Sequence, residues 1–318
     1  MRIFITGSDG FIGQHMVERL SPNHELTFLR ADLRDHDEVK RQVKEANPEI
    51  VVHLAARTEV EQSFYEQTTF SEINYVGTVN LIESCRDLPD FKNFVFASTM
   101  EVYGWQPISD VIKQGFDGTI PAYDEQTQPN PNAPYAVAKY GCEKYLEYAG
   151  RCYEMPYTII RQTNAYGRKD NNFFVTEQII YQMLKNPNEI NLGYGEPYRN
   201  FIYIDDLLDA WETVIANPEK CINEIFCLGP NNAVRIRDYV QTIADKIGWT
   251  GEVFWHTKPD RPGEIYLLNS SNDKLTKMTG WKPKVALSDG LDQTIADWKN
   301  IVENNLPFKD DTRHNRQK

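Results

Sequence analysis

RIFITGSDGFIG, residues 2–13, decides the fold of this chain because an apolar strand runs directly into a glycine-rich turn. The stretch that follows, residues 11–20, has the apolar spacing of a helix. Gly7, Gly10 and Gly13 leave the backbone N–H groups at the start of that helix open to the phosphates of a dinucleotide. Because the spacing G-x-x-G-x-x-G departs from the usual G-x-G-x-x-G, a tight strand-to-helix turn that binds nothing is the alternative interpretation.

Strand and helix candidates alternate beyond this turn through the first half of the chain. Apolar runs such as residues 50–54 are typical of strands buried on both sides. The alternation predicts an α/β fold with a Rossmann-type doubly wound parallel sheet. The expected strands are residues 2–6, 25–30, 50–54, 93–97 and 157–161, and the expected helices are residues 11–20, 37–45, 70–86 and 135–153.

The alternation loosens after Thr163, which indicates a second and smaller unit. Shorter candidates follow at residues 200–204, 206–215, 236–247 and 287–302. We therefore expect a dinucleotide-binding Rossmann domain with the catalytic residues at 1–163 and a smaller, partly interleaved C-terminal substrate-binding lobe at 164–305. Residues 306–318 are expected to form a polar, frayed tail.

Composition narrows the class of protein. The formal net charge of −12 and the lack of a dense basic run argue against nucleic-acid binding. No apolar run approaches the roughly 20 residues of a membrane span, and a strand directly after Met1 leaves no room for a secretory leader. Five cysteines without C-x-x-C spacing fit a cytoplasmic protein with reduced thiols, and six histidines without ligand spacing predict no metal site.

A tyrosine and a lysine four residues apart, Tyr135 and Lys139, open a predicted helix after a proline-rich loop. On a helix they share one face, so the ammonium could favour the ionised phenol and make it a base. Thr99, in the Ser98-Thr99 pair at a strand end, could hydrogen-bond an oxygen on which charge develops. The plainer alternatives are a surface aromatic beside a solvated lysine, and a threonine that caps a local turn.

The end of the second expected strand bears on the choice between NAD and NADP. An acidic residue there binds the ribose hydroxyl, whereas a basic one suits a 2′-phosphate. Here the strand ends at Arg30, with Asp32 close behind. Arg30 therefore slightly favours NADP. The alternative is that Arg30 is only a solvated charge at the end of the strand.

Together these motifs resemble the extended short-chain dehydrogenase/reductase family, specifically the NAD(P)-dependent nucleotide-sugar epimerases and dehydratases. The resemblance runs from Met1 to about Trp298. Its ordered points are the glycine turn, Asp32-Leu33, His53-Leu54-Ala55-Ala56, Asn74 to Gly77, Ser98 to Gly104, Tyr135 to Lys139, Arg199 to Asp206 and Arg261-Pro262-Gly263-Glu264.

The resemblance implies roles for individual residues. Thr99 takes the catalytic Ser/Thr position, Tyr135 is the acid/base, and Lys139 holds the nicotinamide ribose. Asn164, Arg199 and Arg261 join Thr99 as substrate-binding residues, although either arginine could instead be a surface ion-pair residue. The implied cofactor-binding residues are Gly7, Asp9, Gly10, Phe11, Ile12, Gly13, Arg30, Asp32, Leu33, Leu54, Ala55, Ala56, Asn74, Tyr135 and Lys139.

The residues after Thr99 bear on the reaction. By the resemblance, a 4-keto sugar intermediate is shared across the family, and 4,6-dehydratases add an acid and a glutamate base directly after the catalytic threonine. Glu101 occupies the base position and is a fourth catalytic candidate, but Met100 cannot donate a proton. The sequence therefore leans narrowly to a 4-epimerase over a 4,6-dehydratase.

Two further readings remain open. Arg30 also suits an NADPH-dependent reductase of 4-keto-6-deoxy nucleotide sugars, and a cofactor-sensing protein without enzyme activity is a third possibility. The long segment between Thr99 and Tyr135, which includes residues 105–119, is expected to form a loop or lid beside the sugar pocket. The partners implied by the resemblance are a nucleotide-diphosphate sugar and a second copy of this chain.

Overall fold

The structure is a computed structural model that describes residues 1–115, 118–257 and 262–310. Six parallel strands form its central sheet in the order β2-β1-β3-β4-β5-β9. The strand order reverses between β1 and β3, and ligands of open α/β sheets bind at such a point, outside the carboxyl ends of the strands. The strands are β1 (Arg2–Thr6), β2 (Glu25–Phe28), β3 (Ile50–His53), β4 (Asn93–Thr99), β5 (Tyr157–Gln162) and β9 (Glu224–Leu228).

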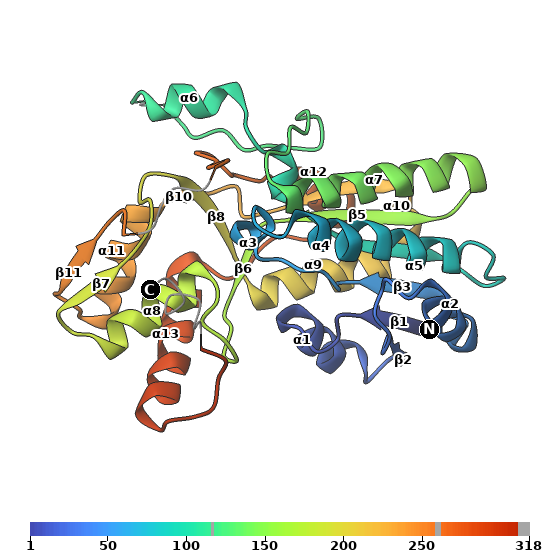
Figure 1. Cartoon of the computed structure of the whole chain (residues 1–318), viewed down its shortest axis with the longest axis horizontal. Helices are drawn as coiled ribbons and strands as arrows, with labels where there is room; N and C mark the ends of the chain where they lie inside the picture. Colours follow the sequence, from blue (N-terminus) through green and yellow to red (C-terminus); the bar gives the residue numbers. More distant parts are fainter. Residues whose placement is uncertain (116–117, 258–261, 311–318) are drawn as a thin grey trace.

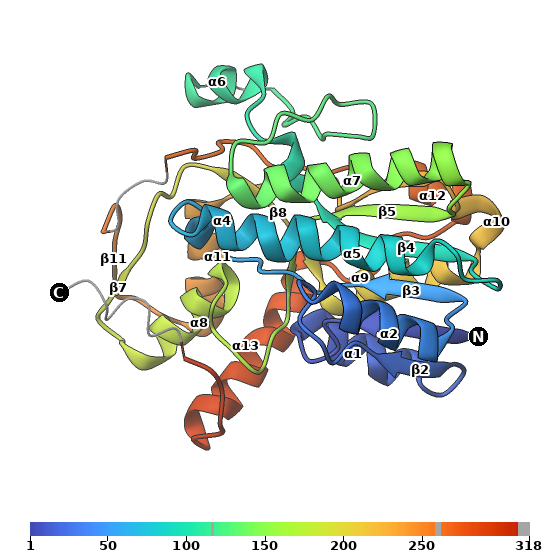
Figure 2. The ribbon, with the colours of Figure 1, turned by 45° about the vertical axis from the view of Figure 1, so that its right-hand side comes forward.

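Helices cover both faces of this sheet, which confirms the predicted fold class (Figure 1). Alternate strand residues enter two cores: Ile3 and Ile5 pack with one set of helices, whereas Phe4 packs with the other. One face carries α1 (Phe11–Leu20) and α9 (Ile204–Ala216). The opposite face carries α2 (His36–Ala46), α5 (Gly77–Cys85) and α7 (Pro134–Tyr153), and the last two lie side by side in both ribbon views (Figure 2).

A smaller lobe is built on a three-stranded sheet, β10-β8-β6, and a two-stranded sheet, β11-β7. Its strands are β6 (Asn164–Tyr166), β7 (Glu189–Asn191), β8 (Tyr198–Tyr203), β10 (Ala233–Arg235) and β11 (Glu252–Phe254). Helices α8 (Val175–Lys185), α11 (Ile236–Ile247) and α13 (Leu287–Glu303) pack around its core.

The chain passes between the two parts more than once. After β8 it returns to the large sheet through α9, α10 (Pro218–Cys221) and β9, and α12 (Asp273–Thr279) later packs against β9. The aromatic side chain of Phe308 packs against Tyr181 and Trp298, and Lys309 pairs with Asn171. The start of the expected frayed tail is therefore held against the lobe by Phe308 and Lys309, and residues 311–318 of that tail lie outside the described residues.

Two expected elements differ from the structure in detail. The predicted helix at 70–86 is divided into α4 (Gln67–Ser71), a π-helical turn η1 (Glu72–Val76) and α5. The expected loop or lid at 105–119 contains α6 (Pro107–Lys113), which stands apart from the sheet at the top of Figures 1 and 2. Ile112 of α6 packs into a small core with Tyr103 and Tyr123. Two short helices complete the elements of the described residues, α3 (Val60–Ser63) and the 3-10 helix η2 (Met100–Tyr103).

Within the described ranges, no helix combines the length and the apolar character that crossing a bilayer requires.

Candidate active site

A cavity of about 400 Å³ lies between the carboxyl ends of the large sheet and the smaller lobe. It is lined from the sheet side by the start of α1, the segment after β3, the end of β4 and the start of α7. The structure brings six of the predicted site residues together in its wall: Ile12, Thr99, Glu101, Tyr135, Asn164 and Arg199. The described part of the segment at 105–119 contributes no lining residue, so the structure gives no support for a lid there.

The reactive end of this cavity is built where α7 crosses the end of β4. Lys139 donates a hydrogen bond from Nζ to the Ala97 carbonyl oxygen at 2.8 Å, and its nitrogen lies 4.7 Å from the centre of the Phe96 ring. Thr99 accepts a hydrogen bond at Oγ1 from the Glu101 backbone N–H at 3.1 Å and so caps η2. Thr99 therefore serves a local turn and the cavity wall at once.

Burial controls the ionisation of the two groups on α7. Removal from water raises the pKa of the Tyr135 phenol, the nearby Glu101 carboxylate adds to the rise, and a hydrogen bond with Thr99 opposes it. Burial also lowers the pKa of Lys139 from 10.5 to about 8. Our expectation that the ammonium makes the phenol acidic is not met here, because burial has the largest effect on the pKa of the phenol and raises it.

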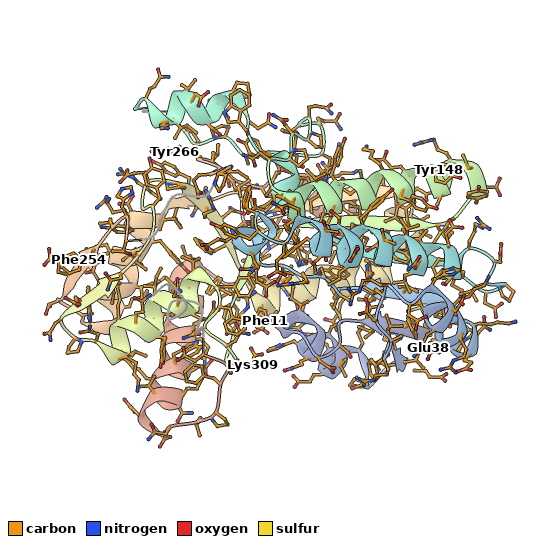
Figure 3. All side chains as sticks on the ribbon, in the orientation of Figure 1. Phe11, Glu38, Tyr148, Phe254, Tyr266 and Lys309 are labelled. Carbon is orange, nitrogen blue, oxygen red and sulfur yellow. The ribbon has the colours of Figure 1, made fainter. Side chains whose placement is uncertain are left out.

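The glycine turn fits the phosphates of a dinucleotide. Gly7 has a φ of +74°, and a Cβ atom on it would lie 2.7 Å from the Ala55 backbone nitrogen. A Cβ atom on Gly13 would lie 2.0 Å from the Gly7 oxygen. No side chain caps the start of α1 at Gly10, so the N–H groups of its first turn remain available to an anion. Phe11 begins α1 in the middle of the molecule, where the two parts meet (Figure 3), and Ile12 lines the cavity.

Three predicted cofactor residues cluster at the end of β2. Arg30 lies beyond the strand with its side chain 60% exposed, and its Nη1 is 3.4 Å from Asp9 Oδ2 on the glycine turn. Asp32 binds Arg34 through three hydrogen bonds of 2.6 to 3.2 Å to its side chain, and the hydrogen bonds from Arg34 lower the pKa of that carboxyl to about 2. Leu33 is buried and packs on the backbone of Gly77.

A buried hydrogen-bond chain joins the glycine turn to the segment after β3. The Ala55 N–H donates to Thr6, whose hydroxyl lies 2.6 Å from His53 Nδ1. His53 Nε2 lies 2.8 Å from the Thr78 hydroxyl, which donates to the Asn74 carbonyl oxygen. Burial holds the pKa of His53 well below its usual range, so this ring is a neutral connector. The Leu54 N–H also donates to the Thr6 carbonyl oxygen, so Leu54 and Ala55 are held beside the turn, and Ala56 follows them in the chain.

Asn74 lies on the π-helical turn, and its side chain is committed to the backbone of Arg57. Its Oδ1 accepts from the Arg57 N–H and its Nδ2 donates to the Arg57 carbonyl oxygen, both at 2.8 Å. Cys142 donates from Sγ to the Asn74 carbonyl oxygen, which ties η1 to α7. Asn74 thus shapes the loop on the cofactor side of the cavity, as π-helical turns at functional sites commonly do.

The substrate-side residues lie in the smaller lobe. Asn164 donates from Nδ2 to the Asn200 carbonyl oxygen at 3.2 Å, and Arg199 binds Glu264 Oε1 from Nη2 at 2.8 Å. Both line the cavity. Arg261 lies outside the described residues.

Other residues that line the cavity were not predicted from the sequence. Thr58 and Glu59 follow β3 on the sheet side, and Tyr194 and Trp255 line the lobe side. Glu59 also acts on Tyr135, since its charge contributes to the raised pKa of the phenol. For these residues the sequence offers one local indication of a binding site, since Tyr194 lies between two glycines, Gly193 and Gly195.

Comparison with known proteins identifies the family. The family model described as "NAD dependent epimerase/dehydratase family" matches residues 3–229. A UDP-glucose 4-epimerase of Thermotoga maritima with UDP-glucose superposes with a TM-score of 0.84 at 28% identity, over 95% of this chain and 100% of that one. A Thermus thermophilus UDP-glucose 4-epimerase in complex with NAD superposes with a TM-score of 0.82 at 28% identity, over 94% of this chain and 99% of that one.

A GDP-6-deoxy-D-mannose reductase of Pseudomonas aeruginosa is 26% identical over 95% of this chain and 98% of its own length. The relatives thus include enzymes named UDP-glucose 4-epimerases and one that is named a reductase. The family expected from the sequence motifs is confirmed. The chain is an enzyme of the NAD-dependent epimerase/dehydratase family, among the nucleotide-sugar epimerases and dehydratases.

Proposed function

We propose that this enzyme is a 4-epimerase of a nucleotide-diphosphate hexose and acts through a 4-keto sugar. The observation that carries the proposal is the shared cavity in which Thr99, Tyr135, Asn164 and Arg199 meet. It opens beside a glycine turn that fits a dinucleotide. A solved relative with UDP-glucose supports the same class of substrate.

Each residue has a distinct task in this scheme. The Tyr135 oxygen removes the proton of the C4 hydroxyl once the phenol has ionised, and the Thr99 hydroxyl hydrogen-bonds the same substrate oxygen as charge develops. Because burial raises the pKa of this phenol, the scheme needs the positive charge that an oxidised nicotinamide would bring beside it to favour the ionised form. When bound at the glycine turn, nicotinamide would supply the acceptor and the donor of the C4 hydride. Arg199 binds the diphosphate through its guanidinium, and Asn164 holds the substrate on the lobe side. The sugar turns between the two steps, so that hydride returns to the opposite face of C4.

Met100 favours epimerisation over dehydration. It lines the cavity beside Glu101, is 2% exposed and has no proton to donate to a departing C6 hydroxyl. Epimerisation needs neither an acid nor a base at these two positions. Glu101 keeps a 4,6-dehydratase as the second candidate, because its carboxylate faces the phenol closely enough to raise the pKa of Tyr135.

The test is a panel of UDP-, dTDP-, GDP- and CDP-hexoses, analysed by chromatography with the absorbance of reduced nicotinamide followed in parallel. We expect interconversion of two C4 epimers without net use of cofactor. A 4-keto-6-deoxy product would establish the dehydratase instead. Sustained consumption of added NADPH with a 4-keto-6-deoxy sugar would establish the reductase.

We propose that Arg30 gives a modest preference for NADP. Its exposed guanidinium could bind a 2′-phosphate, but Asp9 sits 3.4 Å away and would repel the same group. We expect Arg30→Ala to weaken NADP binding about tenfold, in line with the loss of one charge-assisted hydrogen bond, and to change NAD binding less than threefold. Titration of protein fluorescence with each nucleotide measures both affinities. Equal losses of affinity for NAD and NADP would show that Arg30 does not discriminate between the two nucleotides.

We propose that the enzyme is a homodimer that pairs through η1, α5 and α7. Val137 is 55% exposed on α7, and Tyr75 of η1 lies over Gly141, one turn further along the same helix face. Exposed apolar side chains on two adjoining elements are typical of a protein interface.

A charge introduced on this surface tests the dimer. We expect Val137→Glu to convert a dimer into a monomer of 36.9 kDa, because pairing would bury the carboxylate. Light scattering after size exclusion measures the mass. Val111→Glu is the matched control, since Val111 is 49% exposed on the remote helix α6. A wild-type monomer, or a Val137→Glu dimer, would contradict the proposal.

We propose a cytoplasmic location. All five cysteines are free thiols, and four of them are buried: Cys85, Cys142, Cys221 and Cys227. Unpaired thiols of this number suit a reducing compartment.

A further inference from the structure

A buried ion pair lies directly behind Thr99, in a place that the proposed chemistry does not use. Glu143 on α7 is 0% exposed and Arg161 on β5 is 2% exposed. Arg161 donates from Nη2 to Glu143 Oε2 at 2.7 Å and from Nε to Oε1 at 3.1 Å. Burying two charges costs several kcal/mol, so such a pair is weak evidence for stability and calls for another reason.

The pair reaches both flanks of the segment that carries Thr99 and Glu101. On one flank, the Ser98 hydroxyl donates to Glu143, and Ser98 is also the β-sheet partner of Arg161. On the other flank, Arg161 Nη1 donates to the Tyr103 hydroxyl at 3.1 Å. Ser98 is the last residue before Thr99, and Tyr103 ends η2, so the pair fastens this segment at its two ends.

The same face of α7 holds the end of β4 on successive turns. Tyr135, Lys139 and Glu143 are four residues apart, so they project from one side of the helix. Lys139 binds the Ala97 carbonyl oxygen, and Glu143 binds the neighbouring Ser98. The Tyr103 hydroxyl in turn donates to the Asp124 carbonyl oxygen at 2.7 Å, which ties η2 to the chain returning from α6.

We propose that Glu143 and Arg161 are positioning residues that hold Thr99 against Tyr135 for proton transfer. The inference rests on the roles proposed above for these two groups. A catalytic hydroxyl displaced by about 1 Å can lose on the order of a hundredfold in rate, so a rigid support from both flanks has a direct catalytic value. Buried polar networks in which every member is bonded supply that rigidity.

Ser98→Ala and Tyr103→Phe test the two connections separately while they leave the ion pair intact. Ser98→Ala removes the hydrogen bond to Glu143, whereas Tyr103→Phe removes those with Arg161, Asp124 and Cys227. At about 1 kcal/mol for each hydrogen bond, both variants are expected to fold. Glu143→Gln is less informative, because it leaves the buried Arg161 charge without a counter-charge. We expect each variant to lower kcat tenfold or more while KM changes less than threefold. The double variant should lose less than the product of the two single losses, since both act through one pair.

Matched controls remove the same chemical groups elsewhere. Ser84→Ala deletes a buried hydroxyl that donates to the Asn80 carbonyl oxygen on α5, and Tyr145→Phe deletes a phenol that binds Glu83. Values of kcat for Ser98→Ala and Tyr103→Phe within twofold of these controls would overturn the inference.

Amide hydrogen exchange of the peptide spanning residues 97–104 gives a readout that needs no substrate. We expect faster exchange there in Ser98→Ala and Tyr103→Phe, but not in the controls. If the wild type turns over no nucleotide sugar, the proposed function fails. The exchange rates alone then decide whether the ion pair holds this segment in place. Faster exchange would then support the positioning of this segment, and unchanged exchange would overturn it.

Discussion

Tyr135→Phe is expected to abolish turnover while the protein still folds and still binds its nucleotide. The substitution removes only the phenolic oxygen, which is the atom assigned to take and return the proton of the C4 hydroxyl. Loss of a positioned acid/base group costs on the order of 10² to 10⁴ in rate. We expect a loss of kcat near the upper end of this range, because the buried ring that remains has no atom that can accept a proton.

The structure gives a reason why the variant should still fold and still bind its nucleotide. The aromatic ring of Tyr135 is 7% exposed and stays in place in the phenylalanine variant. Thr99 keeps the hydrogen bond that it accepts from Glu101. Steady-state kinetics with the active nucleotide sugar and fluorescence titration with NAD measure the two properties side by side.

Tyr148→Phe is the matched control for this experiment. Tyr148 lies toward the far end of the same helix (Figure 3), where its hydroxyl pairs with that of Tyr153 at 2.8 Å. We expect its kcat to stay within twofold of the wild type. Substantial turnover by Tyr135→Phe would overturn the assignment of the acid/base, and loss of NAD binding would show that the variant disturbs more than proton transfer.

The sheet was predictable because its signals are local. Each early strand is an apolar run next to a turn, and the bounds of α1 agree at both ends with those read from its periodicity. β9 was not predicted as a sheet strand, since Glu224–Leu228 joins β5 from 62 residues further along the chain, after the lobe strands have intervened. Such a pairing depends on tertiary packing, which leaves no periodic signature in the strand itself.

The site was predictable only as a set of residue types. Thr99, Tyr135 and Arg199 do meet in one cavity, but the ionisation of Tyr135 was misjudged because it depends mainly on burial, which residue spacing does not reveal. Glu143 carried a weak signal, since it lies one turn beyond Lys139 on the same helix face. Its partner Arg161 follows from the β4 and β5 register, which cannot be derived from spacing.

Lys139→Met is expected to stabilise the nucleotide-free protein at pH 7 while it removes activity. Burial lowers the pKa of Lys139 from 10.5 to about 8, a shift that corresponds to a cost of about 3 kcal/mol for holding the charged form in the folded state. Methionine fills similar space without a charge. The lost hydrogen bond to the Ala97 oxygen offsets about 1 kcal/mol, which leaves a net gain of roughly 2 kcal/mol.

The sign of the pH dependence separates this explanation from simple repacking. Below pH 8 both the folded and the unfolded wild type bind the Lys139 proton, so the folded state bears the full cost. Between about pH 8 and pH 10.5 the unfolded chain keeps a proton that the folded chain releases, and the free energy of unfolding of the wild type therefore rises. Lys139→Met lacks this rise, so its advantage should be largest at pH 7 and should shrink as the pH approaches 10.5.

Urea unfolding of both proteins at pH 7 and at pH 10 measures this difference, with Lys144→Met as the control. Lys144 lies on the same helix but is half exposed and pairs with Glu147, so its removal should cause no pH-dependent gain. A Lys139→Met variant that is less stable than the wild type at pH 7 would contradict the argument. So would a variant whose gain in free energy of unfolding over the wild type is the same at both pH values. A confirmed gain together with weaker NAD binding would mean that this ammonium is kept in the core at a cost in stability because the nicotinamide ribose requires it.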